Sequence, residues 1–272
     1  MKKILLAFDG TNFSEGAFEF ARRMNEMQPV LITAAFMPQV DYANLWSYSV
    51  GVAGGMVIPL LENEDSSLVK KNINHFERLC NENNIRYRIH KNFYGFAMAE
   101  LRKETRFADL LVIGGEMFYN NMGIEMNDYM RETLKMAECP IVIVPEQYDF
   151  PQSTILTYDG TESAVYAIKQ FACLFPELSS APSVLVYSNP GDEPLPDKEN
   201  MEELVGQHYP KIEYYRLKAA PRKYFDEWVN EKKGTIVVFG AFGRSALSQM
   251  LHKSFASDVI QTLKLPVFIA HK

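Results

Sequence analysis

Residues 3–11 read KILLAFDGT, and residues 153–161 read STILTYDGT. Each stretch is a short apolar run that ends in Asp-Gly-Thr and is followed by an amphipathic segment with helical spacing. A continuous apolar run of this length predicts a buried β-strand, because both faces of a strand in a parallel sheet are covered. The second stretch therefore predicts a second copy of the strand, turn and helix that begin the chain.

The ends of the two halves also match. Leu110–Gly114 parallels Ile236–Gly240, and Pro140–Val144 parallels Pro266–Ala270. In each half, 26 positions separate the glycine from the proline (140 − 114 and 266 − 240). The copies are offset by 150 positions at the first strand but by 126 at these prolines, so the second copy is 24 residues shorter. The difference predicts an insertion at residues 45–67 of the first copy.

Strands and helices alternate in both copies. The first copy is predicted to have strands at 3–9, 30–36, 85–91, 109–114 and 140–144 and helices at 13–27, 66–83, 95–106 and 126–137. The second is predicted to have strands at 154–158, 183–188, 211–217, 235–240 and 266–270 and helices at 162–174, 198–207, 221–232 and 254–263. This order predicts an α/β, Rossmann-like fold of two tandem five-stranded, mostly parallel sheets with helices on both faces, in domains 1–147 and 152–272. Ligands of such sheets bind at the carboxyl ends of the strands.

Composition excludes several classes of function. The chain has 28 basic and 34 acidic residues and no long Lys/Arg run, which is atypical of nucleic-acid binders. Its three cysteines form no C-x-x-C pair, so we expect neither a metal site nor a disulfide framework, and a reducing, cytoplasmic location. Residues 42–61 carry no charge, but their Gly, Pro and Asn content and their place between a strand and a helix favour a packed lid or interface loop over a membrane span.

A glycine loop follows the fourth strand of the second copy. Residues 240–245 read GAFGRS, and nine residues separate Gly243 from Lys253, which precedes Ser254 at the start of a predicted helix. Glycines let the backbone approach a phosphate, and helix N–H groups favour its negative charge. A Gly-x-x-Gly after a strand is by itself more often a tight turn, so the spacing to Ser254 and the Asp-Gly-Thr turn carry the prediction of a phosphate site.

These motifs together resemble the universal stress protein family over the whole chain, as two family domains in tandem. The resemblance implies a five-stranded α/β fold, with one branch that binds ATP or AMP through a Gly-x2-Gly-x9-Gly-Ser/Thr motif and another that binds no nucleotide. In the second copy it implies a phosphate site at Gly240, Gly243 and Ser254, with Asp159 beside the ribose or phosphates, Ser188 near the adenine and Phe239 flanking the base. Arg244 in the same loop is a further candidate for a phosphate contact, although a solvated loop arginine is the commoner case. Lys253 departs from the family glycine, and its side chain either crowds the phosphate or pairs with it.

The first copy departs further from the motif. Gly114 matches the first glycine, but Met117 replaces the second, and Asn127-Asp128 replaces Gly-Ser. An aspartate at a helix N-terminus satisfies the free N–H groups itself and repels a phosphate, so this site is predicted to be degenerate although it keeps Asp9. Asp9 and Asp159 also have a plain structural interpretation, since each can brace the turn before its helix.

The sequence thus predicts a stress-response protein that holds an adenine nucleotide as a regulatory ligand in its second domain. No catalytic base or metal cluster is visible, so we expect no enzyme, or at most a slow ATPase. The alternative is a nucleotide-free protein that acts through protein–protein contacts; an adenine-nucleotide transferase is favoured less. Family domains commonly pair through their last strands, which predicts an intramolecular pseudo-dimer and, beyond it, a homodimer of tandem chains.

Overall fold

The computed structural model describes residues 1–37, 63–91, 97–116, 128–188, 195–217, 233–240 and 265–270. The first half contains β1 (Lys2–Phe8), α1 (Glu15–Met27), β2 (Val30–Phe36), α3 (Asn63–Glu82), β3 (Arg86–Lys91), α4 (Ala97–Arg106), β4 (Leu110–Gly114), α5 (Asp128–Met136) and β5 (Ile141–Val144). The second half contains β6 (Ser153–Tyr158), α6 (Glu162–Leu174), α7 (Pro176–Ser179), β7 (Ser183–Ser188), α8 (Lys198–His208), β8 (Ile212–Leu217), β9 (Thr235–Gly240) and β10 (Val267–Ala270).

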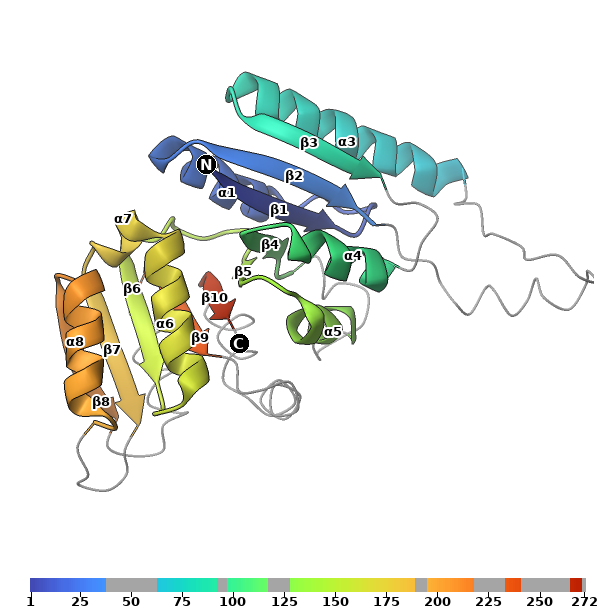
Figure 1. Cartoon of the computed structure of the whole chain (residues 1–272). Coiled ribbons are helices and arrows are strands. Elements are labelled where there is room, and N and C mark those ends of the chain that lie inside the picture. The colour runs from blue at the N-terminus through green and yellow to red at the C-terminus, as the bar shows by residue number, and fades with distance from the viewer. Residues whose placement is uncertain are drawn as a thin grey trace, which may run out of the picture.

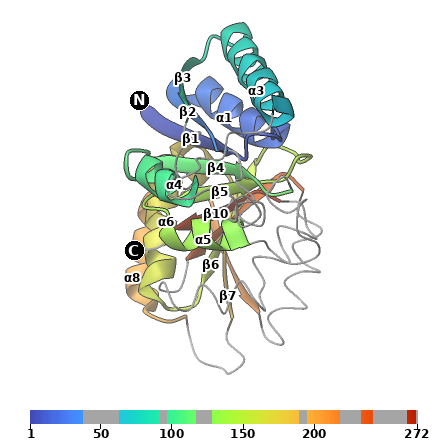
Figure 2. The ribbon, with the colours of Figure 1, turned by 90° about the vertical axis from the view of Figure 1, so that its right-hand side faces the viewer.

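The ten strands form one continuous sheet. Its order is β3-β2-β1-β4-β5-β10-β9-β6-β7-β8, so each half contributes five neighbouring strands in the same relative order. Figure 2 shows this succession, from β3 at one end through β5 and β10 in the middle to β7. The strands of the two ends run in very different directions in Figure 1, as the twist of a wide sheet requires. The predicted α/β fold with mostly parallel strands is confirmed.

The two halves meet at β5 and β10, which pair antiparallel, whereas the strands within each half pair parallel. Val142 lies opposite Phe268 in this pairing. These positions differ by 126 (268 − 142), the same offset that relates the two glycines and the two prolines of the repeat. Equivalent residues therefore face each other, which is the arrangement of two units about a local twofold axis. The pairing of the last strands within one chain, which the family resemblance implies, is present.

Two layers of apolar side chains cover the sheet. Successive residues of a strand point to opposite faces, so Ile4, Leu6 and Phe8 of β1 join one layer and Leu5 and Ala7 the other. The first layer also holds buried residues of α1, α3, α6 and α8, and the second holds buried residues of α4 and α5. Among the described residues, helices thus lie on both faces of the first half of the sheet, and α6 and α8 lie on one face of the second half.

Some predicted boundaries need correction. Helix α3 begins at Asn63 rather than at residue 66, so the end of the predicted insertion 45–67 is helical. The acidic residues at this end suit a loop, but acidic side chains also stabilise the first turn of a helix. The four-residue helix α7, which opens with Pro176, was not predicted. The predicted helices 221–232 and 254–263, and the whole uncharged segment 42–61, lie outside the described residues.

None of the described helices combines the length and apolar character that crossing a bilayer requires.

Candidate functional site

Four of the predicted site residues meet at one edge of the second half. Asp159 follows β6, Ser188 ends β7, and Phe239 and Gly240 end β9. Strand β6 lies between β7 and β9 and is parallel to both, so the three carboxyl ends are neighbours. This is the edge at which ligands bind in open parallel sheets. The other predicted residues, Gly243, Arg244, Lys253 and Ser254, lie outside the described part of the chain.

Asp159 braces the turn that leads from β6 into α6. Its Oδ1 accepts hydrogen bonds from the backbone N–H (3.0 Å) and the hydroxyl (2.6 Å) of Thr161. The Thr161 hydroxyl in turn accepts from the N–H of Ala164 (3.3 Å) and caps the helix. Asp159 is exposed, and within the described residues no donor contacts its Oδ2. The aspartate therefore holds the turn with one oxygen and presents the other at the strand edge.

Asp9, its counterpart in the first half, uses both carboxylate oxygens within its own turn. Oδ1 accepts from the N–H of Thr11 (3.0 Å), the hydroxyl of Thr11 (3.4 Å) and the N–H of Asn12 (2.7 Å). Oδ2 accepts from the side-chain amide of Asn12 (2.8 Å), and the residue is only 7% exposed. The structural interpretation of this aspartate is therefore the better one.

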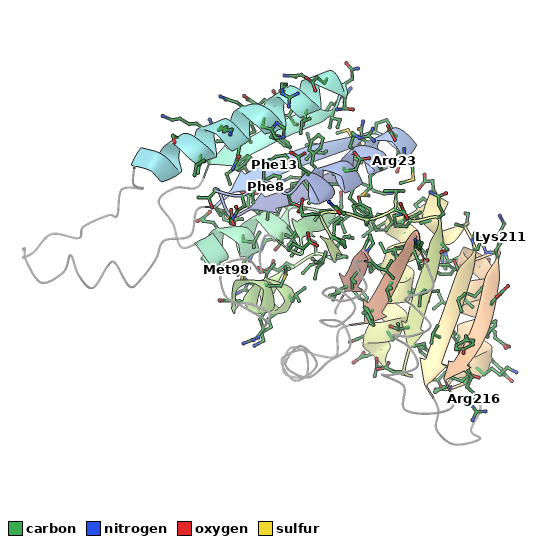
Figure 3. All side chains as sticks on the ribbon, turned by 180° about the vertical axis from the view of Figure 1, so that it is seen from behind. Phe8, Phe13, Arg23, Met98, Lys211 and Arg216 are labelled. Carbon is green, nitrogen blue, oxygen red and sulfur yellow. The ribbon has the colours of Figure 1, made fainter. Side chains whose placement is uncertain are left out.

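Further contacts close the first-half turn. The amide of Asn72 on α3 donates to the carbonyls of Gly10 (3.1 Å) and Thr11 (2.9 Å). The ring of Phe13 stacks on Phe8 with centroids 4.7 Å apart, and Figure 3 shows the two side by side at the end of β1. Asn72 comes from α3 and Phe13 from the turn itself, and no pattern in the sequence indicates either contact.

A carboxylate occupies the N-terminus of α1. Ser14, the N-cap residue, accepts from the N–H of Ala17 (3.1 Å) and donates its hydroxyl proton to Glu146 Oε1. The N–H of Gly16 donates to Glu146 Oε2 (3.2 Å). An anion is stabilised there by the free N–H groups and the helix dipole. The sequence does not single out Glu146, because a glutamate two residues after a strand carries no signal of its partner.

The first glycine of each loop makes room for a helix. A side chain at Gly240 would overlap the backbone of Ala164 on α6, and one at Gly114 would overlap Ser14 at the start of α1. The positions correspond, since 164 − 14 is 150 and 240 − 114 is 126, the two offsets of the repeat. Close approach of strand and helix therefore requires glycine in both halves, whether or not a phosphate binds.

Phe239 and Ser188 lie at the ends of their strands. Phe239 is 5% exposed and belongs to the apolar layer that also contains Ile269 and Leu265. Ser188 pairs with Leu217 in the β7–β8 ladder. Their predicted places beside the base stay predictions. Among the residues that the structure describes, no group of three or more His, Cys, Asp or Glu side chains could hold a metal ion.

No protein-family model matches the sequence, and no curated protein is significantly similar to it. Solved structures do match over the whole chain. A universal stress protein from Archaeoglobus fulgidus superimposes with a TM-score of 0.72 at 16% identity, covering 100% of this chain and 96% of that one. The fold is that of the universal stress proteins. A protein provisionally named a universal stress protein from Pseudomonas aeruginosa has a TM-score of 0.57 at 11% identity, covering 100% and 93% of the two chains. The universal stress protein fold thus extends over both halves of this chain.

Proposed function

We propose that this chain is a universal stress protein that binds an adenine nucleotide, ATP or AMP, in its second half as a regulatory ligand. The proposal rests on the fold, on the glycine loop of residues 240–254 and on the exposed carboxylate of Asp159, which contacts Thr161 through Oδ1. The ligand would lie across the carboxyl ends of β6, β7 and β9, where Asp159, Ser188 and Gly240 meet. Gly243, Arg244, Lys253 and Ser254 would complete the phosphate side.

The contrast between the two Asp-Gly-Thr turns is the observation that carries the proposal. In the first half, four donors engage the Asp9 carboxylate, and Glu146 already occupies the N-terminus of α1. In the second half, Asp159 is exposed and engages Thr161 through one oxygen. A carboxylate oxygen at this edge is a suitable acceptor for a ribose hydroxyl. The second half is therefore the better candidate for nucleotide binding.

A regulatory ligand fits this chemistry better than a substrate. Asp159 holds its own turn, and among the described residues no group of three or more His, Cys, Asp or Glu side chains could hold a metal ion. We propose at most a slow hydrolysis of ATP. A ligand that binds one conformation more tightly than another shifts the population toward it. The nucleotide would in this way bias the choice of a protein partner.

A second candidate is a nucleotide-free protein that acts through its surfaces. The packing of Gly240 against Ala164 favours it, because this glycine is needed for the approach of α6 even without a phosphate. The glycine loop of the second half would then be a structural remnant, and Lys253 would be one sign of its loss.

Equilibrium titration with labelled ATP and AMP tests the proposal, with Asp159→Ala and Asp9→Ala as a matched pair. Loss of hydrogen bonds to a charged group costs about 1.5–3 kcal/mol, so Asp159→Ala should weaken binding by roughly 10–100-fold. Asp9→Ala should lower the free energy of unfolding by about 1–3 kcal/mol, because it leaves partly buried donors of Thr11 and Asn12 without an acceptor, and should leave the affinity unchanged. Gly243→Val should abolish binding.

The titration also separates the alternatives. Absence of binding by the wild-type protein at millimolar nucleotide would rule out the first candidate and leave the second. Loss of affinity in Asp9→Ala but not in Asp159→Ala would move the site to the first half.

The cysteines support a reducing compartment, and we propose the cytoplasm. All three cysteines are free thiols. Burial raises the pKa of Cys80 to about 12 and that of Cys139 to about 12, which keeps both thiols protonated and unreactive. We also propose a homodimer of these tandem chains, which sedimentation would exclude if the protein were a strict monomer.

A further inference from the structure

The connector between the two halves, residues 145–152, lies along α1. The hydroxyl of Tyr148 donates to the carbonyl of Gly16 (3.4 Å), and the ring of Phe150 lies 5.5 Å from that of Phe20. One turn further along the helix, the guanidinium of Arg23 stands over the Phe150 ring, 5.1 Å from its centroid; Figure 3 labels Arg23 on α1. The connector thus follows the helix from its first turn to its third.

Glu146 fastens the start of this connector. Its carboxylate accepts from the Ser14 hydroxyl and from the N–H of Gly16, both at the N-terminus of α1. Gly16 also allows the connector to approach, since a side chain there would overlap the carbonyl oxygen of Pro145. The charge of Glu146 and the missing side chain of Gly16 therefore both hold the connector at the N-terminus of α1. We call Glu146, Ser14 and Gly16 the Glu146 latch.

The other end of the connector is held by the second half. The N–H of Gln152 donates to the carbonyl of Gly234 (2.7 Å), in the turn before β9, and the N–H of Ser153 donates to the same carbonyl (3.3 Å). The strand ladder that joins the halves is short: Val267, Phe268 and Ile269 pair with residues 143, 142 and 141. The connector is therefore a tie between the halves that is separate from this strand ladder.

We propose that the Glu146 latch sets the position of the second half on the first, and that its release frees the connector while both halves stay folded. The carboxylate belongs to the segment that leads into the second half, and its donors belong to the first half. Breaking the latch removes the tie at the N-terminus of α1, and the connector residues Tyr148 and Phe150 that pack against the edge of the first apolar layer are then released, while the buried residues of both layers stay in place. The proposal does not depend on nucleotide binding.

Limited cleavage by chymotrypsin after Tyr148 tests the latch in the full-length protein. Glu146→Ala removes the carboxylate, Gly16→Ala displaces Pro145, and Gln147→Ala, at an exposed neighbouring position, is the control. When opening is fast relative to cleavage, the rate follows the population of the open form, so both latch variants should be cut after Tyr148 at least about ten-fold faster than wild type. Gln147→Ala should be cut at the wild-type rate. X-ray scattering should give a larger radius of gyration for the two latch variants only.

Faster cleavage of Gly16→Ala could not be caused by a weaker α1 helix. Alanine is the better helix former, so helix propensity alone would slow opening, whereas the latch predicts faster cleavage. If Glu146→Ala fails to fold, the cleavage rate of Gly16→Ala still tests the proposal. Wild-type cleavage rates in the latch variants would overturn the proposal. Faster cleavage throughout both halves, or an unchanged radius of gyration, would also overturn it, since the halves would then be unfolding or keeping their position.

Discussion

Gly114 and Gly240 stand at equivalent positions, at the ends of β4 and β9, and each lies against the start of a helix. The resemblance to the universal stress proteins implies a phosphate contact at Gly240. The structure adds a packing reason that holds in both halves, including the one whose motif is degenerate. A glycine in a ligand motif can therefore be required by the fold itself, and binding must be tested at other positions of the loop.

We predict that Gly240→Ala destabilises the protein without any nucleotide present. Its methyl group would overlap Ala164, and overpacking of this kind costs about 1–3 kcal/mol. Gly206→Ala on α8 is the matched control, because nothing lies within 4 Å of its added methyl group. Alanine should stabilise that helix by up to about 1 kcal/mol. Urea unfolding of both variants measures the difference, and shifts in the same direction would contradict the packing argument.

The elements of the first half are tied together at Glu138, which lies between α5 and β5. The carboxylate accepts from Arg106 through Nε (2.7 Å) and Nη2 (3.0 Å) and from Arg102 through Nε (3.0 Å), both on α4. The hydrogen bond from Arg106, followed by that from Arg102, lowers the pKa of Glu138 to about 2. The three side chains fasten α4 to the segment that enters β5.

This ion pair makes a contribution to stability that depends on pH. The pKa of Glu138 is lowered on folding, so the contribution is full above the usual value of 4.5 and is lost as the pH falls toward 2. We predict that Glu138→Gln is less stable than wild type near neutral pH and that the difference disappears over this acid range. The pair is exposed, so the difference should be small and shrink at high salt. Urea unfolding across the pH range measures it, and a difference that grows on acidification would refute the assignment.

At the scale of the whole molecule, aromatic rings fill the junction between the halves. The ring centroids of Phe20 on α1 and Phe175 at the end of α6 lie 6.1 Å apart, and those of Phe175 and Phe268 on β10 lie 5.9 Å apart. The ammonium of Lys2 donates to the carbonyl of Leu174 (2.5 Å) across the same junction. With the sheet continuous through β5 and β10, these contacts should make the two halves unfold together.

We predict that Phe20→Ala destabilises both halves although it changes only the first. Removing a buried phenyl ring costs about 3–5 kcal/mol. Hydrogen exchange should show faster opening of β6 and β9 as well as of β1, within a single cooperative transition. Phe107→Ala, at a ring that is 64% exposed, is the control and should change the free energy of unfolding by no more than about 0.5 kcal/mol. Loss of protection confined to the first half would show that the halves are energetically separate.

The alternation of strands and helices and the two equivalent Asp-Gly-Thr turns could be predicted from the sequence, and the pairing of the last strands from the resemblance to the universal stress proteins. Apolar periodicity and a fixed offset between copies are local properties, and they can be read without knowing any contact. The ends of helices could not be predicted to the residue, as the start of α3 at Asn63 shows, because polar residues suit both a loop and the first turn of a helix.

Only the tertiary structure distinguished the two aspartates. Asp9 and Asp159 sit in the same tripeptide, yet Asn12 and the packing around the first turn enclose one, while the other keeps an exposed oxygen. The same holds for Glu146, whose partners Ser14 and Gly16 lie more than a hundred positions away in the chain. Burial and hydrogen bonding depend on which residues the fold brings together, and that information is absent from any short stretch of sequence.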